Sequence, residues 1–337
     1  MIILNYRECV EKSKKYKEKY RLSIDSFIEK HQTECEKQRK EFTDGIFDRQ
    51  DEYRRNFFDM LGYPLNLNID KLSKNAEYEK LSDEGTYEVY RLHIDVIDDI
   101  RLTGLFFKKK DKKYPLIIAQ HGLLGSPEAA SGFYGDTSNY HDMITRLFKY
   151  DVHIFAPQLL LWDADFYKVD YDRILLDSRL KSVGSSITAL EVYGLIRSID
   201  YFETLDYVSG FGMIGLSYGG FYSLFTAAAD TRIKATLSCS FFNDSSKRPM
   251  ADWLWQNSAK FFTDSEVACL IYPRKLYIKV GSRDPLFKSK NSVFENERLK
   301  VLCKNVGTHW YNYEVFDGVH EFFCSDSDMN AIISELN

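Results

Sequence analysis

Residues 215–219, which read G-L-S-Y-G, constrain the fold of this chain more than any other segment. They follow an apolar segment, 209–214, that is typical of a short buried strand, and they precede a segment, 220–229, that is typical of a helix. A sharp turn from strand to helix strains the backbone of its central residue and leaves no room for bulky side chains two residues away. The sequence therefore predicts a nucleophile elbow, in which the Ser217 hydroxyl projects above the edge of a sheet.

The chain after residue 81 alternates between strand-like and helix-like segments. Apolar and polar residues alternate at 90–96, and a second such segment at 101–107 completes a predicted antiparallel hairpin. Further strands are predicted at 114–120, 151–157, 233–240, 275–281 and 311–316. Strands that alternate with helices indicate an α/β fold with a mostly parallel, doubly wound sheet. We expect residues 81–337 to form this domain.

Residues 1–80 differ from the rest of the chain in composition. From about residue 7 to residue 61 the sequence is dense in Lys, Glu, Arg and Gln, with apolar residues at helical intervals. Gly62 and Pro64 are a typical stop signal for the last helix. We therefore expect an N-terminal helical extension of two or three amphipathic helices. Their apolar faces must be buried on the α/β domain or on a second copy, so a homo-oligomer formed through these helices is one expectation.

Charge and cysteine content narrow the classes of ligand and location. A formal net charge of -5 over 337 residues argues against nucleic acid or an anionic membrane as a partner and favours a small molecule. The six cysteines are scattered without a C-x-x-C pair, so neither a zinc site nor a redox dithiol is predicted. No segment is apolar over the length of a signal peptide or a membrane span. We expect a cytoplasmic protein that uses no metal and no cofactor.

Two further residues lie where a catalytic partner of Ser217 is expected. Ligands of open α/β sheets bind outside the carboxyl ends of the strands. Asp284 follows the predicted strand at 275–281, and His320 follows the one at 311–316. The order Ser217, Asp284, His320 is that of the α/β-hydrolase triad. Each residue alone has an ordinary interpretation as a turn or loop residue, so the prediction rests on the agreement of all three.

Other residues compete for the roles of acid and base. Asp244 also follows a predicted strand at the same edge and is an alternative to Asp284 as the triad acid. His309 precedes the last strand, so we expect it at the opposite end of the sheet. His153 lies inside a predicted strand. These positions leave His320 as the expected base and leave the acid open between two residues.

Acyl transfer also needs hydrogen-bond donors for the oxyanion, and two backbone groups are predicted to supply them. The elbow contributes the N–H of Tyr218. The second donor is expected after the strand at 114–120, where residues 121–125 read H-G-L-L-G, and we assign it to the N–H of Leu123. His121 is expected to be a buried, hydrogen-bonded residue that supports this loop.

Two segments rich in aromatic residues open at the same edge of the predicted sheet. One is 159–167, which contains Trp162, and the other is an insertion at 243–262, which contains Trp253 and Trp255. Aromatic residues in such loops either line a ligand pocket or pack in the hydrophobic core, and the sequence is compatible with both roles. We name the three tryptophans as candidate substrate-binding residues.

Taken together, these motifs resemble the α/β-hydrolase superfamily over roughly residues 87–337. The branch that the chain resembles is that of dienelactone hydrolases and acetylxylan esterases. The segments that carry the resemblance are 54–64, 121–125, 215–220, 270–275 and 281–284. True dienelactone hydrolases use a cysteine nucleophile, whereas this chain has Ser217, which favours ordinary esters over lactones.

The resemblance implies a serine hydrolase that cleaves carboxylic esters through an acyl-enzyme, with a short acyl group on a sugar or small metabolite. A peptidase of the prolyl-oligopeptidase type shares the triad, but the chain has no room for a propeller domain. A non-catalytic relative that only binds a partner is the third reading. The presence of all triad members argues against it.

Overall fold

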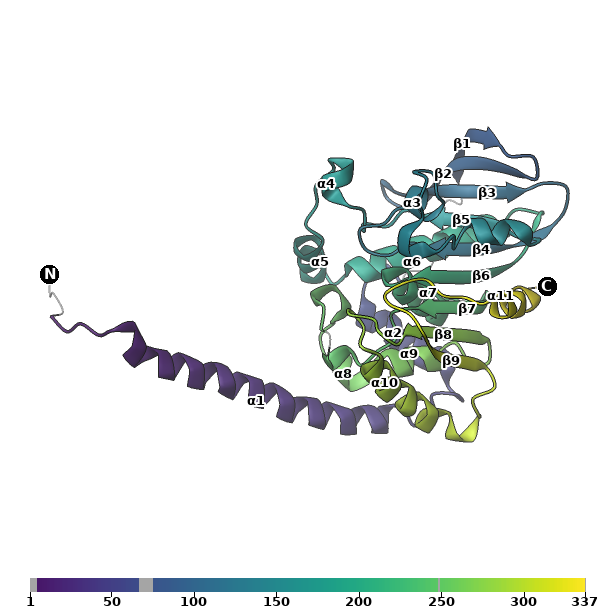
Figure 1. The fold of residues 1–337 in the computed structure, drawn as a ribbon. Helices are drawn as coiled ribbons and strands as arrows, with labels where there is room; N and C mark the ends of the chain where they lie inside the picture. Colours follow the sequence, from purple (N-terminus) through teal and green to yellow (C-terminus); the bar gives the residue numbers. More distant parts are fainter. Residues whose placement is uncertain (1–4, 67–74, 248, 337) are drawn as a thin grey trace.

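The computed structural model describes residues 5–66, 75–247 and 249–336, and one large sheet organises them (Figure 1). The strands are β1 (Ala76–Asp83), β2 (Tyr87–Ile97), β3 (Ile100–Lys109), β4 (Tyr114–Gln120), β5 (His153–Pro157), β6 (Val208–Leu216), β7 (Ile233–Cys239), β8 (Lys275–Gly281) and β9 (Tyr311–Phe316). Their order across the sheet is β1-β2-β3-β5-β4-β6-β7-β8-β9. The pairs from β1 to β5 are antiparallel and all later pairs are parallel. This confirms the mostly parallel sheet with a leading hairpin.

Helices cover both faces of the sheet (Figure 1). The α-helices are α1 (Val10–Phe42), α2 (Gln50–Leu61), α3 (Pro127–Ala130), α4 (Ala164–Tyr167), α5 (Arg173–Ser182), α6 (Ile187–Glu203), α7 (Tyr218–Ala229), α8 (Ser258–Phe261), α9 (Asp264–Cys269), α10 (Ser289–Leu302) and α11 (Asp326–Ser334). Short 3-10 helices are η2 (Ser138–Tyr140), η3 (Thr145–Lys149), η4 (Ser245–Lys247), η5 (Ala251–Trp253) and η6 (Cys303–Asn305). Within the described residues, no helix combines the length and apolarity needed to cross a membrane.

The hydrophobic core divides into one cluster on each face of the sheet. The larger cluster joins α2, α6 and α7 to the sheet, and the smaller one joins α11 and the loop between β4 and β5 to the opposite face. Strands β4, β6 and β7 are buried along almost their whole length. Burial on both faces is typical of parallel strands covered by helices, and it holds their carboxyl ends rigidly at one edge.

The N-terminal region differs in one respect from the expected helical extension. Helices α1 and α2 form as expected, but strand β1 begins at Ala76 and pairs with β2, so the end of the range 1–80 belongs to the sheet. Helix α2 also belongs to the body of the protein. Arg54 donates from Nε to the carbonyl oxygen of Ala228 at 2.9 Å, and Phe57 is fully buried. Of these two helices, α1 is the one that extends away from the body (Figure 1).

Candidate active site

Ser217 lies at the sharp turn that the sequence predicts. It connects β6 to α7 with φ 60° and ψ -121°, a conformation that a non-glycine residue adopts only under strain. Its N–H donates to the carbonyl oxygen of Cys239 on β7 at 2.8 Å, which fixes the turn against the next strand. A Cβ on Gly215 would lie 2.2 Å from the carbonyl oxygen of Gly219, so this close approach requires glycine. The sheet therefore holds the strained serine in place.

Asp284 and His320 lie after β8 and β9, and the structure brings them together. Nδ1 of His320 and Oδ2 of Asp284 form a hydrogen bond of 2.8 Å. The other carboxylate oxygen accepts the backbone N–H groups of Leu286 and Phe287 at 2.7 and 2.9 Å. The Phe287 ring stacks on the imidazole, with 5.6 Å between ring centroids. Each oxygen of this buried carboxylate thus has a hydrogen-bond partner. The imidazole is oriented by its hydrogen bond to Asp284 and by the Phe287 ring stacked on its face.

Asp244 and His309, the alternatives to Asp284 and His320, do not take part in this hydrogen bond. The carboxylate of Asp244 accepts the N–H and the hydroxyl of Ser246, at 3.0 and 2.6 Å, within its own loop. His309 is exposed and precedes β9, and its carbonyl oxygen accepts from Lys275 at the start of β8. Asp244 and His309 are therefore in different surroundings from the pair formed by His320 and Asp284.

The loop after β4 lies directly against the elbow. A Cβ on Gly122 would lie 3.1 Å from the Cβ of Ser217, and the Gly122 N–H donates to the hydroxyl of Tyr140 at 3.0 Å. Leu123, the next residue, is partly exposed. Tyr218 is the first residue of α7, a position where a backbone N–H has no partner within the helix. The two expected oxyanion donors therefore belong to segments on either side of the serine.

His121 is buried and hydrogen-bonded, as expected for a residue that supports the loop. Its Nδ1 lies 2.9 Å from the carbonyl oxygen of Gly122, and its Nε2 accepts the N–H of Leu159 at 3.4 Å. Burial lowers the pKa of His121 to about 4. The ring is therefore neutral near pH 7, and it ties the loop after β4 to the loop after β5.

Comparison with known proteins rests on structure. No family model matches the chain, and no curated protein matches it. A candidate acetyl xylan esterase from Bacteroides fragilis aligns with a TM-score of 0.67 at 14% identity, covering 86% of this chain and 83% of that one. A glucuronoyl esterase from Solibacter usitatus aligns at 0.61 and 15% identity, over 85% and 91% of the chains. Acetyl xylan esterase 1 from a Thermoanaerobacterium species aligns at 0.55 and 15% identity, over 85% and 92%. The chain has the α/β-hydrolase fold.

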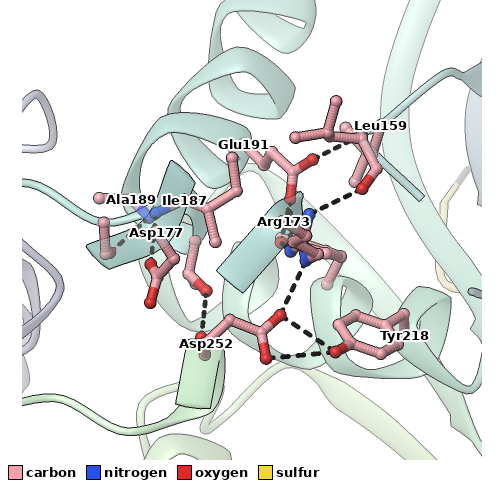
Figure 2. A network of polar contacts seen from close by, with 12 residues as sticks. Leu159, Arg173, Asp177, Ile187, Ala189, Glu191, Tyr218 and Asp252 are labelled. Carbon is pink, nitrogen blue, oxygen red and sulfur yellow. Dashed lines mark hydrogen bonds and ion pairs between the residues drawn. The ribbon is translucent and has the colours of Figure 1, made fainter. Parts of the chain in front are cut away.

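A buried polar network that sequence reasoning missed reaches Tyr218, the residue after Ser217 in this α/β-hydrolase fold (Figure 2). Its centre is Arg173 on α5, which donates from Nε to Asp252 at 2.7 Å and from a terminal nitrogen to Glu191 at 2.9 Å. The same guanidinium donates to the carbonyl oxygen of Leu160 at 3.0 Å. The hydroxyl of Tyr218 donates to the Asp252 carboxylate at 3.0 Å. The residue after Ser217 is therefore tied to α5, to α6 and to the insertion at 243–262.

The charges of the network stabilise one another. Burial alone would lower the pKa of Arg173, but Glu191, Tyr222 and Asp252 outweigh it and hold this pKa well above its usual value. Burial raises the pKa of Tyr218, and the neighbouring Asp252 raises it further. Arg173 therefore stays charged and Tyr218 stays a neutral donor across the physiological pH range.

The three candidate tryptophans occupy two different places in the α/β-hydrolase fold. Trp162 packs against Tyr171 with its ring tilted by 58°, at 4.8 Å between ring centroids, and lines an open pocket of about 490 Å³ that also includes Leu124 of the loop after β4. Trp253 and Trp255 line a separate cavity of about 910 Å³ between α1, α10 and the insertion. Trp253 is buried and packs on the Tyr218 ring at 4.7 Å. Trp162 thus shares a pocket with the loop beside Ser217, whereas Trp253 and Trp255 line the other cavity.

Proposed function

We propose that this protein is a serine esterase that cleaves carboxylic esters through an acyl-enzyme intermediate. The observation that carries the proposal is the hydrogen bond between His320 and Asp284 in a protein whose strained elbow bears Ser217. A hydroxyl becomes a good nucleophile only when an oriented base removes its proton. The names of the structural neighbours, which include acetyl xylan and glucuronoyl esterases, support the same class of reaction.

In the proposed mechanism, Nε2 of His320 accepts the proton of Ser217 as Oγ attacks the ester carbonyl. Asp284 accepts the hydrogen bond from Nδ1 and stabilises the imidazolium that forms. The N–H groups of Leu123 and Tyr218 donate to the oxyanion. His320 then returns the proton to the departing alcohol, and water hydrolyses the acyl-enzyme by the same steps in reverse.

The substrate that we propose is a small ester with a short acyl group, in which a sugar or similar metabolite is the alcohol. We propose that the alcohol part of the ester binds in the pocket lined by Leu124, Trp162 and Tyr171. Paired aromatic rings offer flat apolar surfaces, and Asp170 and Asp172 at the same pocket offer acceptors for hydroxyl groups. We propose no nucleic acid or membrane partner, in line with the small net charge, and the unpaired cysteines support a cytoplasmic location.

The proposal is tested with a fluorophosphonate probe and a panel of p-nitrophenyl esters beside aminoacyl amides. We expect labelling of the wild type at Ser217, and Ser217→Ala should lose labelling and about 10⁴-fold or more of kcat. Ser246→Ala, a hydroxyl in the insertion, is the matched control and should retain both. Turnover of the amides in preference to the esters would instead indicate a peptidase. An active Ser217→Ala protein with unchanged folding would refute the mechanism.

The choice of acid is tested separately. Asp284→Asn should reduce kcat/KM far more than Asp244→Asn, because only the first removes the carboxylate that holds His320. His320→Ala should abolish activity and His309→Ala should leave it unchanged. A larger loss from Asp244→Asn than from Asp284→Asn would reassign the acid.

A further inference from the structure

Helix α1 presents an apolar stripe that the described residues of this chain leave exposed. The helix spans Val10–Phe42, and at 1.5 Å per residue it is about 50 Å long. Its C-terminal end is anchored, because Arg39 forms an ion pair with Glu266 at 3.4 Å and Phe42 packs on Phe262. Its N-terminal part extends away from the body (Figure 1).

Four exposed apolar residues on this part, together with His31, share one face. Residues 16, 20, 24, 27 and 31 follow one another in steps of three and four, which places them on one side of a helix. Tyr20 is 71% exposed and Phe27 is 63% exposed. The ring of His31 rests on that of Phe27, at 4.2 Å between centroids. A contiguous exposed stripe of this kind on a protein marks an interaction surface.

The charge pattern of α1 is complementary to itself when reversed. Residues 11–21 carry six basic and two acidic side chains, whereas residues 25–36 carry four acidic and one basic. Two α1 helices side by side in the same direction would place like charges together. In the opposite direction, the basic part of each helix lies beside the acidic part of the other.

The apolar stripe reverses about the same centre as the charges. With the two-fold axis near residues 23 and 24, Tyr16 of one copy meets His31 of the other, and Tyr20 meets Phe27. The bodies do not compete for space in this arrangement, because each is attached at the C-terminal end of its own helix and the two lie at opposite ends of the pair. We propose that a second copy of this chain covers the stripe, as an antiparallel dimer of α1 helices.

The dimer is tested by mass, which does not depend on ester hydrolysis. We expect the full chain to show about twice its 39.4 kDa by light scattering and to dissociate in high salt. Tyr20→Glu with Phe27→Glu should give a monomer with an unchanged thermal transition of the body. Leu22→Glu is the matched control, because Leu22 is 56% exposed on the same helix but lies off the stripe, and it should remain dimeric. A monomeric wild type, including one that sediments with anionic vesicles instead, or a stripe variant as dimeric as the wild type, would overturn the proposal.

The orientation is tested with the native cysteines. Cys9 and Cys35 lie at α1, while Cys239, Cys269, Cys303 and Cys324 are buried. In the antiparallel pair, Cys9 of one copy lies about one turn from Cys35 of the other, whereas identical cysteines are far apart. A short bismaleimide cross-linker should therefore give a covalent dimer. Cys9→Ser alone and Cys35→Ser alone should each abolish it. Covalent dimers that survive either single substitution would indicate parallel helices and refute the antiparallel arrangement.

Discussion

His153 makes folding stability depend on pH in a direction that the structure fixes. Its Nδ1 accepts the N–H of Lys109 and its Nε2 donates to the carbonyl oxygen of Tyr207, both at 3.1 Å. A proton added to Nδ1 would point at the Lys109 N–H, so only the neutral imidazole can make both hydrogen bonds. Burial, with a smaller contribution from the positive charges of Lys108 and Lys109, lowers the pKa of His153 to about 4.

The sign and size of the effect follow from linkage between protonation and folding. The histidine of the unfolded chain has its ordinary pKa of about 6.5, so below this pH the unfolded state binds a proton that the folded state refuses. The stabilising contribution of neutral His153 is complete above pH 6.5 and is lost as the pH falls toward 4. With these two pKa values, the free energy of unfolding drops by about 2 kcal/mol between pH 8 and pH 5 from this residue alone.

The assay is urea unfolding of the wild type and His153→Gln at pH 8 and pH 5. Glutamine can accept and donate at the same time but does not titrate, so this variant should be less stable at pH 8 by about 1 kcal/mol or more. Between pH 8 and pH 5 the wild type should lose about 2 kcal/mol relative to the variant, so that at pH 5 the difference in stability is cancelled or reversed. Carboxylates titrate in both proteins and cancel in the comparison. His309→Gln, at an exposed histidine, should run parallel to the wild type. Parallel behaviour of His153→Gln as well would refute the reasoning.

Two further predictions concern the surroundings of Ser217. Gly122→Ala should lower kcat by about 10²-fold, because its Cβ would lie 3.0 Å from the carbonyl oxygen of Leu216 and would shift the loop that carries the Leu123 donor. Gly194→Ala, whose Cβ would meet nothing closer than 3.8 Å, is the control in the same kinetic assay and should be silent. Asp252→Asn should lower the free energy of unfolding by about 2 kcal/mol and reduce kcat, whereas the exposed Asp206→Asn should change neither in denaturation and kinetic measurements. Unchanged kcat in both Gly122→Ala and Asp252→Asn would mean that these contacts do not position the donors.

The sheet and the elbow were predictable because their signals are local. Buried parallel strands are short continuous apolar runs, and the glycines around Ser217 mark a turn that few other residues permit. The chain order of strands then places Asp284 and His320 at one edge without any knowledge of contacts. Their hydrogen bond follows from that placement, while their catalytic roles stay predictions.

Strand β1 was missed because it lacks such a signal. Its sequence, A-E-Y-E-K-L-S-D, carries few apolar residues, and most of them are exposed at the edge of the sheet. Pairing with β2 decides its structure, through contacts that no local pattern records. The boundary of the helical extension at residue 80 was therefore placed inside a strand.

The Arg173 network was out of reach for a different reason. Its charged members, Arg173, Glu191 and Asp252, are spread over about eighty positions, and each resembles an ordinary surface residue in its own segment. Only the folded chain removes them from water together. Sequence patterns report periodicity and turns, and a long-range buried ion pair has neither.

The same network explains how segments outside the sheet bear on the proposed chemistry. Burying three charges is costly unless each is fully partnered, and removing one partner leaves the others uncompensated. Arg173 therefore requires Asp252 and Glu191 at once, so α5, α6 and the insertion must be in place together. Asp252 also accepts a hydrogen bond from the hydroxyl of Tyr218. The packing of these segments therefore fixes Tyr218, whose backbone N–H is the proposed oxyanion donor. The packing of α5, α6 and the insertion is therefore coupled to the position of the Tyr218 N–H. A substitution of Arg173, Glu191 or Asp252 should disturb both.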